Sequence, residues 1–270
     1  MASNRSSFRS AYGPWAVVTG GSEGLGAEFA SQLAAAGLNL VLVARRAEPL
    51  VRHAADIRTR HGIVVRELPL DLSDRGAVEH LLGHLASLDV GLLVCNAAVS
   101  PLGPFLELPP DVHGRLIDLN CRAAALLAWE LGQRMAARGS GGIILVSSMA
   151  GFQGTGHVVH YAASKAYLRV LAEGLWDELR PRGVHALACC PGLVRTPTFL
   201  KGEPERPRWL ASPLMDAAPV VREALSALGR KPVVVPGRAN RCALWITEHL
   251  MPRRARVAMA SRGTRAMYGA

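Results

Sequence analysis

Short apolar runs alternate with amphipathic, alanine-rich stretches along most of the chain. The run 15–19 ends at two glycines, and 25–36 then has the composition of a helix, which predicts a strand, a glycine loop and a helix. Gly37 ends this helix, and 38–44 is a continuous apolar run, as expected of a strand buried on both faces of a sheet. Five further strand-like runs follow, at 63–65, 91–95, 143–146, 184–190 and 232–235.

This alternation predicts an α/β fold. Strands separated by helical crossovers pair in parallel, and right-handed crossovers place helices on both faces of an open, twisted sheet. We therefore expect a doubly wound, seven-stranded parallel sheet in a single domain over 14–237. The sequence also predicts a polar lead at 1–13, a proline-rich lid loop at 194–213 and a basic helical extension at 238–270.

The composition excludes several classes of protein. Half of the 270 residues are apolar and 19% are charged, so the bulk of the chain is expected to fold around a core. No run of 18 uninterrupted apolar residues occurs, and the start lacks the apolar stretch of a secretory signal, so we expect a cytoplasmic protein. The five cysteines show no C-x-x-C spacing, which favours reduced thiols over a disulfide scaffold.

Positive charge is concentrated near the end of the sequence. The formal net charge is +10, and 230–270 holds nine basic residues against the single acid Glu248, a net charge of +8. Such a tail could attract an anionic membrane surface, a phosphorylated substrate or nucleic acid. We favour a solvated or oligomer-facing segment, because arginine is used throughout the chain and no nucleic-acid motif accompanies the charge.

The first loop has the residues of a dinucleotide site, Thr19-Gly20-Gly21-Ser22-Glu23-Gly24-Leu25-Gly26. Gly20 permits a tight exit from the strand, Gly24 lets backbone approach a pyrophosphate, and Gly26 allows close packing of helix on sheet. The phosphates would bind at the helix N-terminus, where unpaired N–H groups favour anions. Three glycines also make ordinary turns, and the position between the first strand and the first helix is what makes the interpretation specific.

The end of the second predicted strand indicates which dinucleotide binds. An acid at this place takes the adenosine ribose hydroxyls of NAD, whereas a basic residue accommodates the 2′-phosphate of NADP. The sequence here is Val43-Ala44-Arg45-Arg46, without an acid, and the guanidinium of Arg45 can bind a phosphate. We therefore expect NADP(H); the alternative is two solvated arginines that end a strand.

Ser148, Tyr161 and Lys165 are the candidates for proton chemistry. On a helix, positions 161 and 165 lie one turn apart on one face, so the phenol and the ammonium can serve one site. A neighbouring cation stabilises phenolate, which would lower the pKa of Tyr161 and let it act as an acid or base. Ser148 can donate a hydrogen bond to a carbonyl oxygen as negative charge develops on it. Taken singly, each residue has an ordinary alternative as a surface neighbour or a strand-ending serine.

These residues occur with others in one order and spacing. The joint pattern resembles the short-chain dehydrogenase/reductase family, classical type, over about 14–236, and consists of Thr19-Gly20-x-x-x-Gly24-x-Gly26, Asn96-Ala97, Asn120, Ser148, Tyr161-x-x-x-Lys165 and Pro191-Gly192. The resemblance implies a Rossmann-type sheet with Tyr161 as the catalytic acid or base. It also implies that Lys165 lowers the pKa of Tyr161 and holds the nicotinamide ribose, and that Ser148 orients the substrate carbonyl. Asn120 would help to hold a water in a proton relay.

The resemblance further implies a set of cofactor contacts. Asp71-Leu72 is similar to the family's adenine-contacting pair, and 191–196 is similar to its P-G-x-V-x-T segment. One departure is Cys95-Asn96-Ala97-Ala98, where the family usually has N-N-A-G, and we expect it to perturb a turn beside the adenosine. The expected cofactor residues are Gly20, Ser22, Gly24, Leu25, Gly26, Arg45, Asp71, Leu72, Asn96, Ala97, Tyr161, Lys165, Pro191, Gly192, Val194 and Thr196.

The function implied is reversible hydride transfer between NADP(H) and a carbonyl/alcohol pair, mainly as ketone reduction. The predicted pocket walls are 100–105, 149–159 and the proline-rich loop with Phe199 and Trp209. They are mostly apolar, which suits a 3-oxoacyl chain, a steroid-like ring system or an aryl ketone. The alternative is a non-catalytic NADP(H)-binding sensor on the same fold, which would tolerate loss of the catalytic residues that are present here.

The partners expected are a small apolar substrate and further copies of the chain. In the family, the helix after Asn120 and the helix that carries Tyr161 commonly form the dimer interface. Apolar residues on the first of these fit such a face or the core: Leu126, Leu127, Trp129 and Leu131. The tail from 239 resembles the basic extension of some lipid-handling members, so membrane contact and packing across a subunit boundary both stay open. His157 and His160 lack zinc spacing, so we expect no metal site and a place beside the pocket for both.

Overall fold

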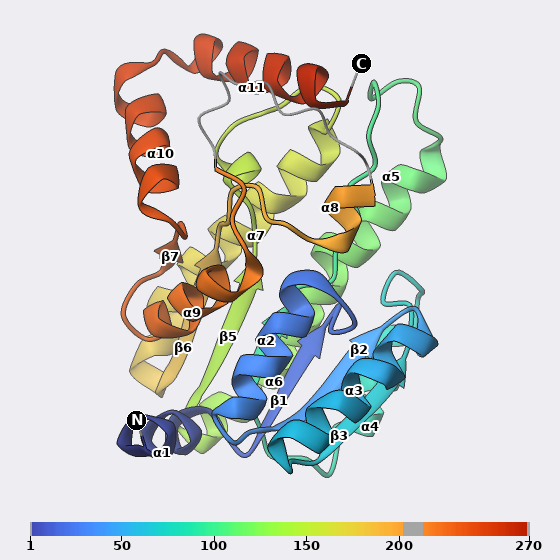
Figure 1. Cartoon of the computed structure of the whole chain (residues 1–270), viewed down its shortest axis with the longest axis vertical. Coiled ribbons are helices and arrows are strands. Elements are labelled where there is room, and N and C mark those ends of the chain that lie inside the picture. The colour runs from blue at the N-terminus through green and yellow to red at the C-terminus, as the bar shows by residue number, and fades with distance from the viewer. Residues whose placement is uncertain (1, 202–212, 269–270) are drawn as a thin grey trace.

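The computed structural model describes residues 2–201 and 213–268 and contains one sheet of seven strands (Figure 1). All neighbouring strands pair in parallel, in the order β3-β2-β1-β4-β5-β6-β7. The strands are β1 (Trp15–Thr19), β2 (Asn39–Ala44), β3 (Val65–Pro69), β4 (Val90–Cys95), β5 (Gly141–Val146), β6 (Val184–Cys189) and β7 (Val233–Val234). The predicted doubly wound, Rossmann-type α/β fold is confirmed.

Two hydrophobic cores lie on the two faces of this sheet. Because side chains alternate along a strand, Val17 and Val18 of β1 enter different cores. The helices packed on the Val18 face are α2 (Gly24–Ala35), α3 (Ala47–His61) and α9 (Ala217–Ala227). The helices packed on the Val17 face are α4 (Ala77–His84), α6 (Ala124–Arg138) and α7 (Val159–Leu179).

Shorter elements connect these layers. α5 (Pro110–Ile117) continues through a π-helical turn, η1 (Asp118–Ala123), into α6. Two 3₁₀ turns, η2 (Met149–Phe152) and η3 (Arg180–Arg182), flank α7. Among the described helices, none has the length and apolar content that a membrane crossing requires.

The third strand lies further along the chain than predicted. The apolar run 63–65 indicated it, whereas β3 pairs with β2 from Val65 to Pro69. β3 forms one edge of the sheet, and Arg66 and Glu67 occupy it with polar side chains. The apolar pattern therefore covers only the first residue of the strand.

Two segments for which we predicted no helix contain one. The polar lead forms α1 (Ala2–Tyr12), and the hydroxyl of the buried Tyr12 lies 2.8 Å from Nδ1 of His185 on β6. Within the proline-rich segment, α8 (Pro197–Lys201) begins at a proline, which the first turn of a helix tolerates because an N–H there has no helical partner. Residues 202–212 of the expected lid, Trp209 included, lie outside the described residues.

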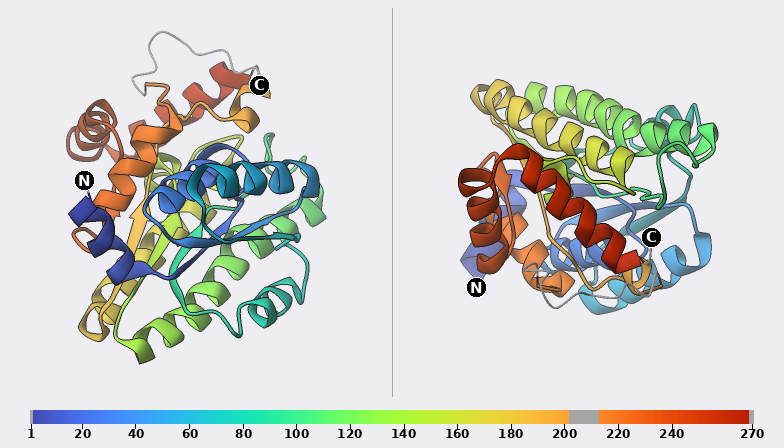
Figure 2. Two further views of the ribbon diagram at one scale, coloured as in Figure 1. Left: turned by 60° about the horizontal axis from the view of Figure 1, so that its bottom comes forward. Right: turned by 90° about the horizontal axis from the view of Figure 1, so that it is seen from above.

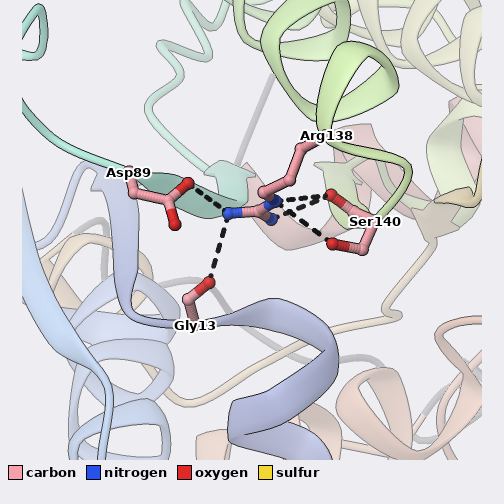
Figure 3. Close-up of polar contacts among 4 residues, drawn as sticks. All are labelled: Gly13, Asp89, Arg138 and Ser140. Atoms are coloured by element: carbon pink, nitrogen blue, oxygen red, sulfur yellow. Dashed lines mark hydrogen bonds and ion pairs between the residues drawn. The ribbon is translucent and has the colours of Figure 1, made fainter.

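Arg138 at the end of α6 aligns the starts of three strands (Figure 3). Its guanidinium donates to the carbonyl oxygens of Ser140, at 2.8 and 3.1 Å, and Gly13, at 3.3 Å, and pairs with Asp89. Ser140 precedes β5, Gly13 lies just before β1, and Asp89 precedes β4. One side chain therefore links the segments that enter β1, β4 and β5, at the end of the sheet remote from the glycine loop.

The chain ends in two helices, α10 (Arg238–Leu250) and α11 (Arg253–Tyr268), at the end of the sheet toward which the strands point (Figure 1). Seen from above, α11 crosses this end between the two helical layers (Figure 2). Arg253 donates to the carbonyl oxygen of Phe152 at 3.0 Å, and the hydroxyl of Ser261 accepts from the backbone N–H of Gly156 at 2.8 Å. The basic extension is therefore fastened to the segment between β5 and α7.

Candidate active site

The glycine loop after β1 is shaped for close approach of backbone. Gly20 and Gly24 have φ of +69° and +59°, a region that glycine adopts readily and other residues rarely. A Cβ at Gly26 would lie 2.0 Å from the carbonyl oxygen of Gly20, so α2 meets the loop only with glycine at this position. Asn96, after β4, donates from Nδ2 to the carbonyl oxygens of Thr19 at 3.1 Å and Gly20 at 3.2 Å. These bonds hold the loop against the sheet.

A groove of about 350 Å³ extends from this loop past the ends of β2 and β4. It brings together most of the residues predicted to contact a cofactor: Gly20, Ser22, Gly24, Leu25, Arg45, Asp71, Leu72, Asn96, Ala97, Tyr161 and Thr196. The predicted residues outside its lining are Gly26, Lys165, Pro191, Gly192 and Val194. The groove also includes Ser100, the first residue of the predicted wall 100–105. The sequence analysis missed Val99 and Leu119, which follow strands or motifs without a pattern of their own.

Two arginines lie at the end of β2, where we predicted the 2′-phosphate site, and they differ in their partners. Arg46 is paired with Glu23 of the glycine loop at 2.7 Å. Arg45 keeps 61% of its side chain exposed and lies 3.8 Å from Asp71. Burial raises the pKa of Asp71, but hydrogen bonds from Ser73 and the nearby arginines outweigh burial, so this pKa lies below its ordinary value. Arg45 therefore has a weakly held guanidinium at the rim of the groove.

Tyr161 and Ser148 meet beside the groove. Tyr161 lies in the first turn of α7 and lines the groove, and Ser148, which follows β5, is hydrogen-bonded to it. The Ser148 hydroxyl also accepts from the backbone N–H of Ala150 at 3.1 Å, which fixes it at the start of η2. The two hydroxyls predicted to act on a carbonyl are thus adjacent in the fold.

Lys165 is buried next to Tyr161 on the same face of α7. The residue is 3% exposed, and its Nζ lies 5.5 Å from the centroid of the Tyr161 ring. Nζ donates to the carbonyl oxygen of Val146 at 2.8 Å. Burial lowers the pKa of Lys165 to about 8, because the charged form is poorly solvated there.

The pKa of Tyr161 differs from the one we expected. We expected the ammonium of Lys165 to lower it, whereas in the structure burial raises the pKa of Tyr161 above its ordinary value. The hydrogen bond with Ser148 offsets only part of this effect. Sequence spacing shows that two groups share a helix face, but the cost of ionising a phenol depends on how much water the surrounding fold removes.

Asn120 is buried in the π-helical turn η1, and π turns are frequent at functional sites. Its Oδ1 accepts from the backbone N–H of Val99 at 2.9 Å. Its Nδ2 donates to the carbonyl oxygen of Val99 at 3.0 Å and to the hydroxyl of Ser164 at 3.1 Å. The side chain therefore connects the segment after β4 to α7, and its part in a proton relay stays a prediction.

A second compartment is a cavity of about 280 Å³, and Ser148 is one of the residues that line it. Met149, Ala150, Gln153 and Thr155 line it, and all four belong to the predicted wall 149–159. Gly192 and Leu193 after β6 line it too, with Ala243, Leu244 and Thr247 of α10. Among the described residues, Phe199 and 100–105 do not line this cavity.

The roof of this cavity is a face of α11 that the sequence analysis missed. Its residues recur every three to four positions, as one face of a helix does: Arg256, Met259, Ala260, Thr264 and Met267. This spacing was the available signal. It is weak, because arginines and alanines make up much of α11 and the apolar stripe is short.

Two histidines that we expected beside the pocket have other contacts. Nδ1 of His160 lies 3.0 Å from Nδ1 of His113 on α5. His157 has a φ of +62° and accepts a hydrogen bond at its carbonyl oxygen from Gly103. Neither histidine lines the groove or the cavity. The described residues contain no group of three side chains that could hold a metal ion.

The cysteines and the apolar residues of α6 divide between core and surface. Four cysteines are buried thiols, and Cys242 is exposed. On α6, Leu127 and Leu131 lie in the core and Leu126 packs against it, whereas Trp129 is 64% exposed. The core alternative is therefore confirmed for Leu127 and Leu131, whereas an oligomer face at Trp129 stays a prediction.

Comparison with known proteins agrees with this geometry. Residues 14–206 match a family model for short chain dehydrogenases. The chain is 31% identical over 234 residues to a 7beta-hydroxysteroid dehydrogenase of Clostridium sardiniense, an alignment that covers 87% of this chain and 89% of that protein.

Solved structures give the same result. The structure of a 7beta-hydroxysteroid dehydrogenase is similar with a TM-score of 0.89 at 27% identity, and the match covers 94% of this chain and 98% of the other. A short-chain dehydrogenase from Sphingobium yanoikuyae, solved with NADPH, has a TM-score of 0.75 at 29% identity and covers 87% of this chain and 93% of its own.

Proposed function

The chain belongs to the short-chain dehydrogenase family, and we propose that it is an NADP(H)-dependent oxidoreductase that interconverts an apolar ketone and a secondary alcohol, mainly by reduction. The observation that carries this proposal is the pair of Tyr161 and Ser148. Tyr161 lines the groove and its hydrogen-bond partner Ser148 lines the cavity. A cofactor in the groove and a carbonyl compound in the cavity would therefore meet at two hydroxyls.

The residues of the groove fit a phosphorylated dinucleotide. The N-terminus of α2 offers unpaired N–H groups to a pyrophosphate, and the close packing at Gly26 brings that N-terminus against the loop. The exposed guanidinium of Arg45 suits a 2′-phosphate, and the NADPH bound to the Sphingobium relative supports the same choice. When bound, the nicotinamide supplies the hydride that the carbonyl carbon receives.

Tyr161 is the proton donor to the carbonyl oxygen in this proposal. Burial raises its pKa, so the phenol is protonated at neutral pH, as a donor must be. Ser148 donates a hydrogen bond to the same oxygen as negative charge develops on it. The buried ammonium of Lys165, 5.5 Å from the ring centroid, stabilises the phenolate that remains after the proton has moved.

A steroid-like ketone is the substrate class we favour. Methionine, leucine and alanine side chains make up most of the cavity wall, as at Met149, Leu193 and Met259. The similarity to hydroxysteroid dehydrogenases extends over 87% or more of the chain, which supports a ring system over an acyl chain. A 3-oxoacyl thioester and an aryl ketone are the competing substrates for the test.

The decisive assay follows the absorbance of NADPH and NADH with three ketones, a 7-oxo steroid, a 3-oxoacyl thioester and an aryl ketone. We expect oxidation of NADPH, slower oxidation of NADH, and the highest rate with the steroid. A protein that binds NADPH and oxidises it with none of the three would contradict the enzyme and favour the sensor.

We also propose a homo-oligomer formed through α6 and α7. Trp129 on α6 and Tyr167 and Val170 on α7 are large apolar side chains on the surface, a pattern typical of an interface. Sedimentation of the wild type and Trp129→Glu tests this, and a monomeric wild type would contradict it.

Trp245, Ile246 and Leu250 are exposed on α10, and co-sedimentation with anionic liposomes is the corresponding test of membrane contact.

A further inference from the structure

We propose that Thr155 and Arg256 form a subsite for an acceptor-oxygen group of the substrate, best matched by a carboxylate, away from the reacting carbonyl. The inference rests on the proposed function, because it takes the cavity that contains Ser148 as the substrate site. Both residues line that cavity but come from different walls. Thr155 lies between η2 and α7, and Arg256 lies in the first turns of α11.

Thr155 lines the cavity and carries an unsatisfied hydroxyl. The residue is 6% exposed, and its Oγ1 has no hydrogen-bond partner within the part of the chain that the structure describes. Native proteins leave few buried polar atoms unpaired, because the lost hydration is not replaced. Valine would fill the same volume without this loss, so a hydroxyl at this place indicates a ligand group that binds it.

Arg256 is the only charged side chain among the described residues that line the cavity, and its guanidinium is only partly engaged. Nη1 lies 3.2 Å from a carboxylate oxygen of Glu248 on α10, and the side chain is 14% exposed. Its Nε is buried and has no partner among residues 2–201 and 213–268. A guanidinium carries five donors in a planar fork, so the pair with Glu248 orients it and leaves a second edge for two oxygens of a carboxylate.

The other hydroxyls of the cavity already have partners. Thr247 and Thr264 donate to carbonyl oxygens of their own helices, at 2.9 and 3.2 Å. Ser148 is hydrogen-bonded to Tyr161. Apart from the uncharged amide of Gln153, the side chains of the described lining left to recognise a polar substituent are therefore those of Thr155 and Arg256.

α11 carries Arg256 and contacts the segment that contains Thr155. The residue after Thr155, Gly156, donates its backbone N–H to Ser261 at 2.8 Å. Ser261 and Arg256 are five residues apart, about 7.5 Å along a helix axis. α11 carries five arginines and no acidic residue, so the potential at the roof favours an anion over a neutral acceptor.

The test measures binding by calorimetry to the full chain in the presence of NADP+, which cannot reduce a ketone. The probes are a 7-oxo steroid with a side-chain carboxylate and the methyl ester of the same compound. We expect the wild type to bind the acid roughly 10- to 100-fold more tightly than the ester. Arg256→Met should abolish this preference, because it weakens binding of the acid far more than binding of the ester. Arg254→Met removes an equal charge from the exposed side of α11 and should keep the preference.

Thr155→Val supplies a second, independent measurement. It should weaken binding of the acid several-fold while the unfolding temperature stays equal or rises, because an unpaired hydroxyl is removed. A purely structural role would lower the unfolding temperature. Equal affinity of the wild type for acid and ester, or an intact preference in Arg256→Met, would overturn the subsite.

Turnover with NADPH separates this inference from the proposed function. Reduction of both probes without any preference for the acid overturns the subsite and leaves the reaction standing. Selective binding of the acid without reduction of either probe supports the subsite and contradicts the proposed reduction of a steroid-like ketone.

Discussion

The ammonium of Lys165 lies 5.5 Å from the centroid of the Tyr161 ring and 2.8 Å from the carbonyl oxygen of Val146. Burial lowers the pKa of Lys165 to about 8 and raises the pKa of Tyr161, so the surrounding fold disfavours the charged forms of both groups. The chain keeps a neutral proton donor beside a cation that is poorly solvated. Such a cation gains most from any negative charge that forms next to it, and the phenolate of Tyr161 is that charge.

Replacing Lys165 by methionine should change how stability depends on pH. Below about pH 8 the ammonium is charged in both the folded and the unfolded chain, and its burial destabilises the fold fully. Between about 8 and the ordinary value of 10.5 the unfolded chain binds one more proton, so the free energy of unfolding of the wild type rises with pH. The rise amounts to about 3 kcal/mol at 1.36 kcal/mol per pKa unit.

Urea unfolding of the wild type and Lys165→Met at several pH values measures this difference. Titratable groups away from Lys165 behave alike in both proteins and cancel in the comparison. The wild type should gain stability relative to the variant as the pH rises through this range. Parallel curves would show that Lys165 keeps an ordinary pKa in the fold.

Tyr161→Phe removes the proposed proton donor and little else. We expect kcat to fall by roughly 10²- to 10⁴-fold, the usual contribution of a positioned acid, with little change in NADPH affinity. Tyr167→Phe on the same helix lies outside the groove and the cavity and should retain full activity. If Tyr161→Phe turned over at the wild-type rate, the mechanism would be wrong.

The sequence predicts the parts of the site that depend on local spacing. Thr19 to Gly26 sit between a strand and a helix because those elements are continuous with the motif, and Tyr161 and Lys165 share a face because four residues make about one helical turn. Ser148 is likewise found beside Tyr161, as the resemblance implied.

The parts that depend on tertiary burial could not be predicted in this way. The cavity joins Thr155 to Arg256 across 101 positions of the sequence, and no local pattern relates the two. The raised pKa of Tyr161 follows from the layers packed around it. The apolar pattern of the sequence does not reveal most of β3, because an edge strand carries polar residues such as Arg66. Each of these features is decided by what covers a residue in the fold.

Arg45→Ser should shift the cofactor preference from NADPH toward NADH. The guanidinium of Arg45 is largely exposed and loosely paired, so a 2′-phosphate can engage it with little competition. Loss of charge-assisted hydrogen bonds should weaken NADPH binding by roughly 10- to 100-fold and leave NADH binding nearly unchanged. Arg52→Ser, on the exposed side of α3 and paired with Glu48, is the matched control. Equal weakening of both cofactors would argue against a 2′-phosphate site.

Gly26→Ala tests whether the groove depends on close packing of α2 against the glycine loop. The added Cβ would lie 2.0 Å from the carbonyl oxygen of Gly20 and 2.5 Å from Nδ2 of Asn96, and one of these contacts is backbone that cannot rotate away. The helix must move off the loop, so we expect a loss of about 1–3 kcal/mol in the free energy of unfolding together with weaker NADPH binding. Gly83→Ala is the matched helical control, because an added Cβ there meets nothing within 4 Å, and it should stabilise α4 by up to about 1 kcal/mol. If both variants bound NADPH like the wild type, the contact between α2 and the loop would not be what shapes the site.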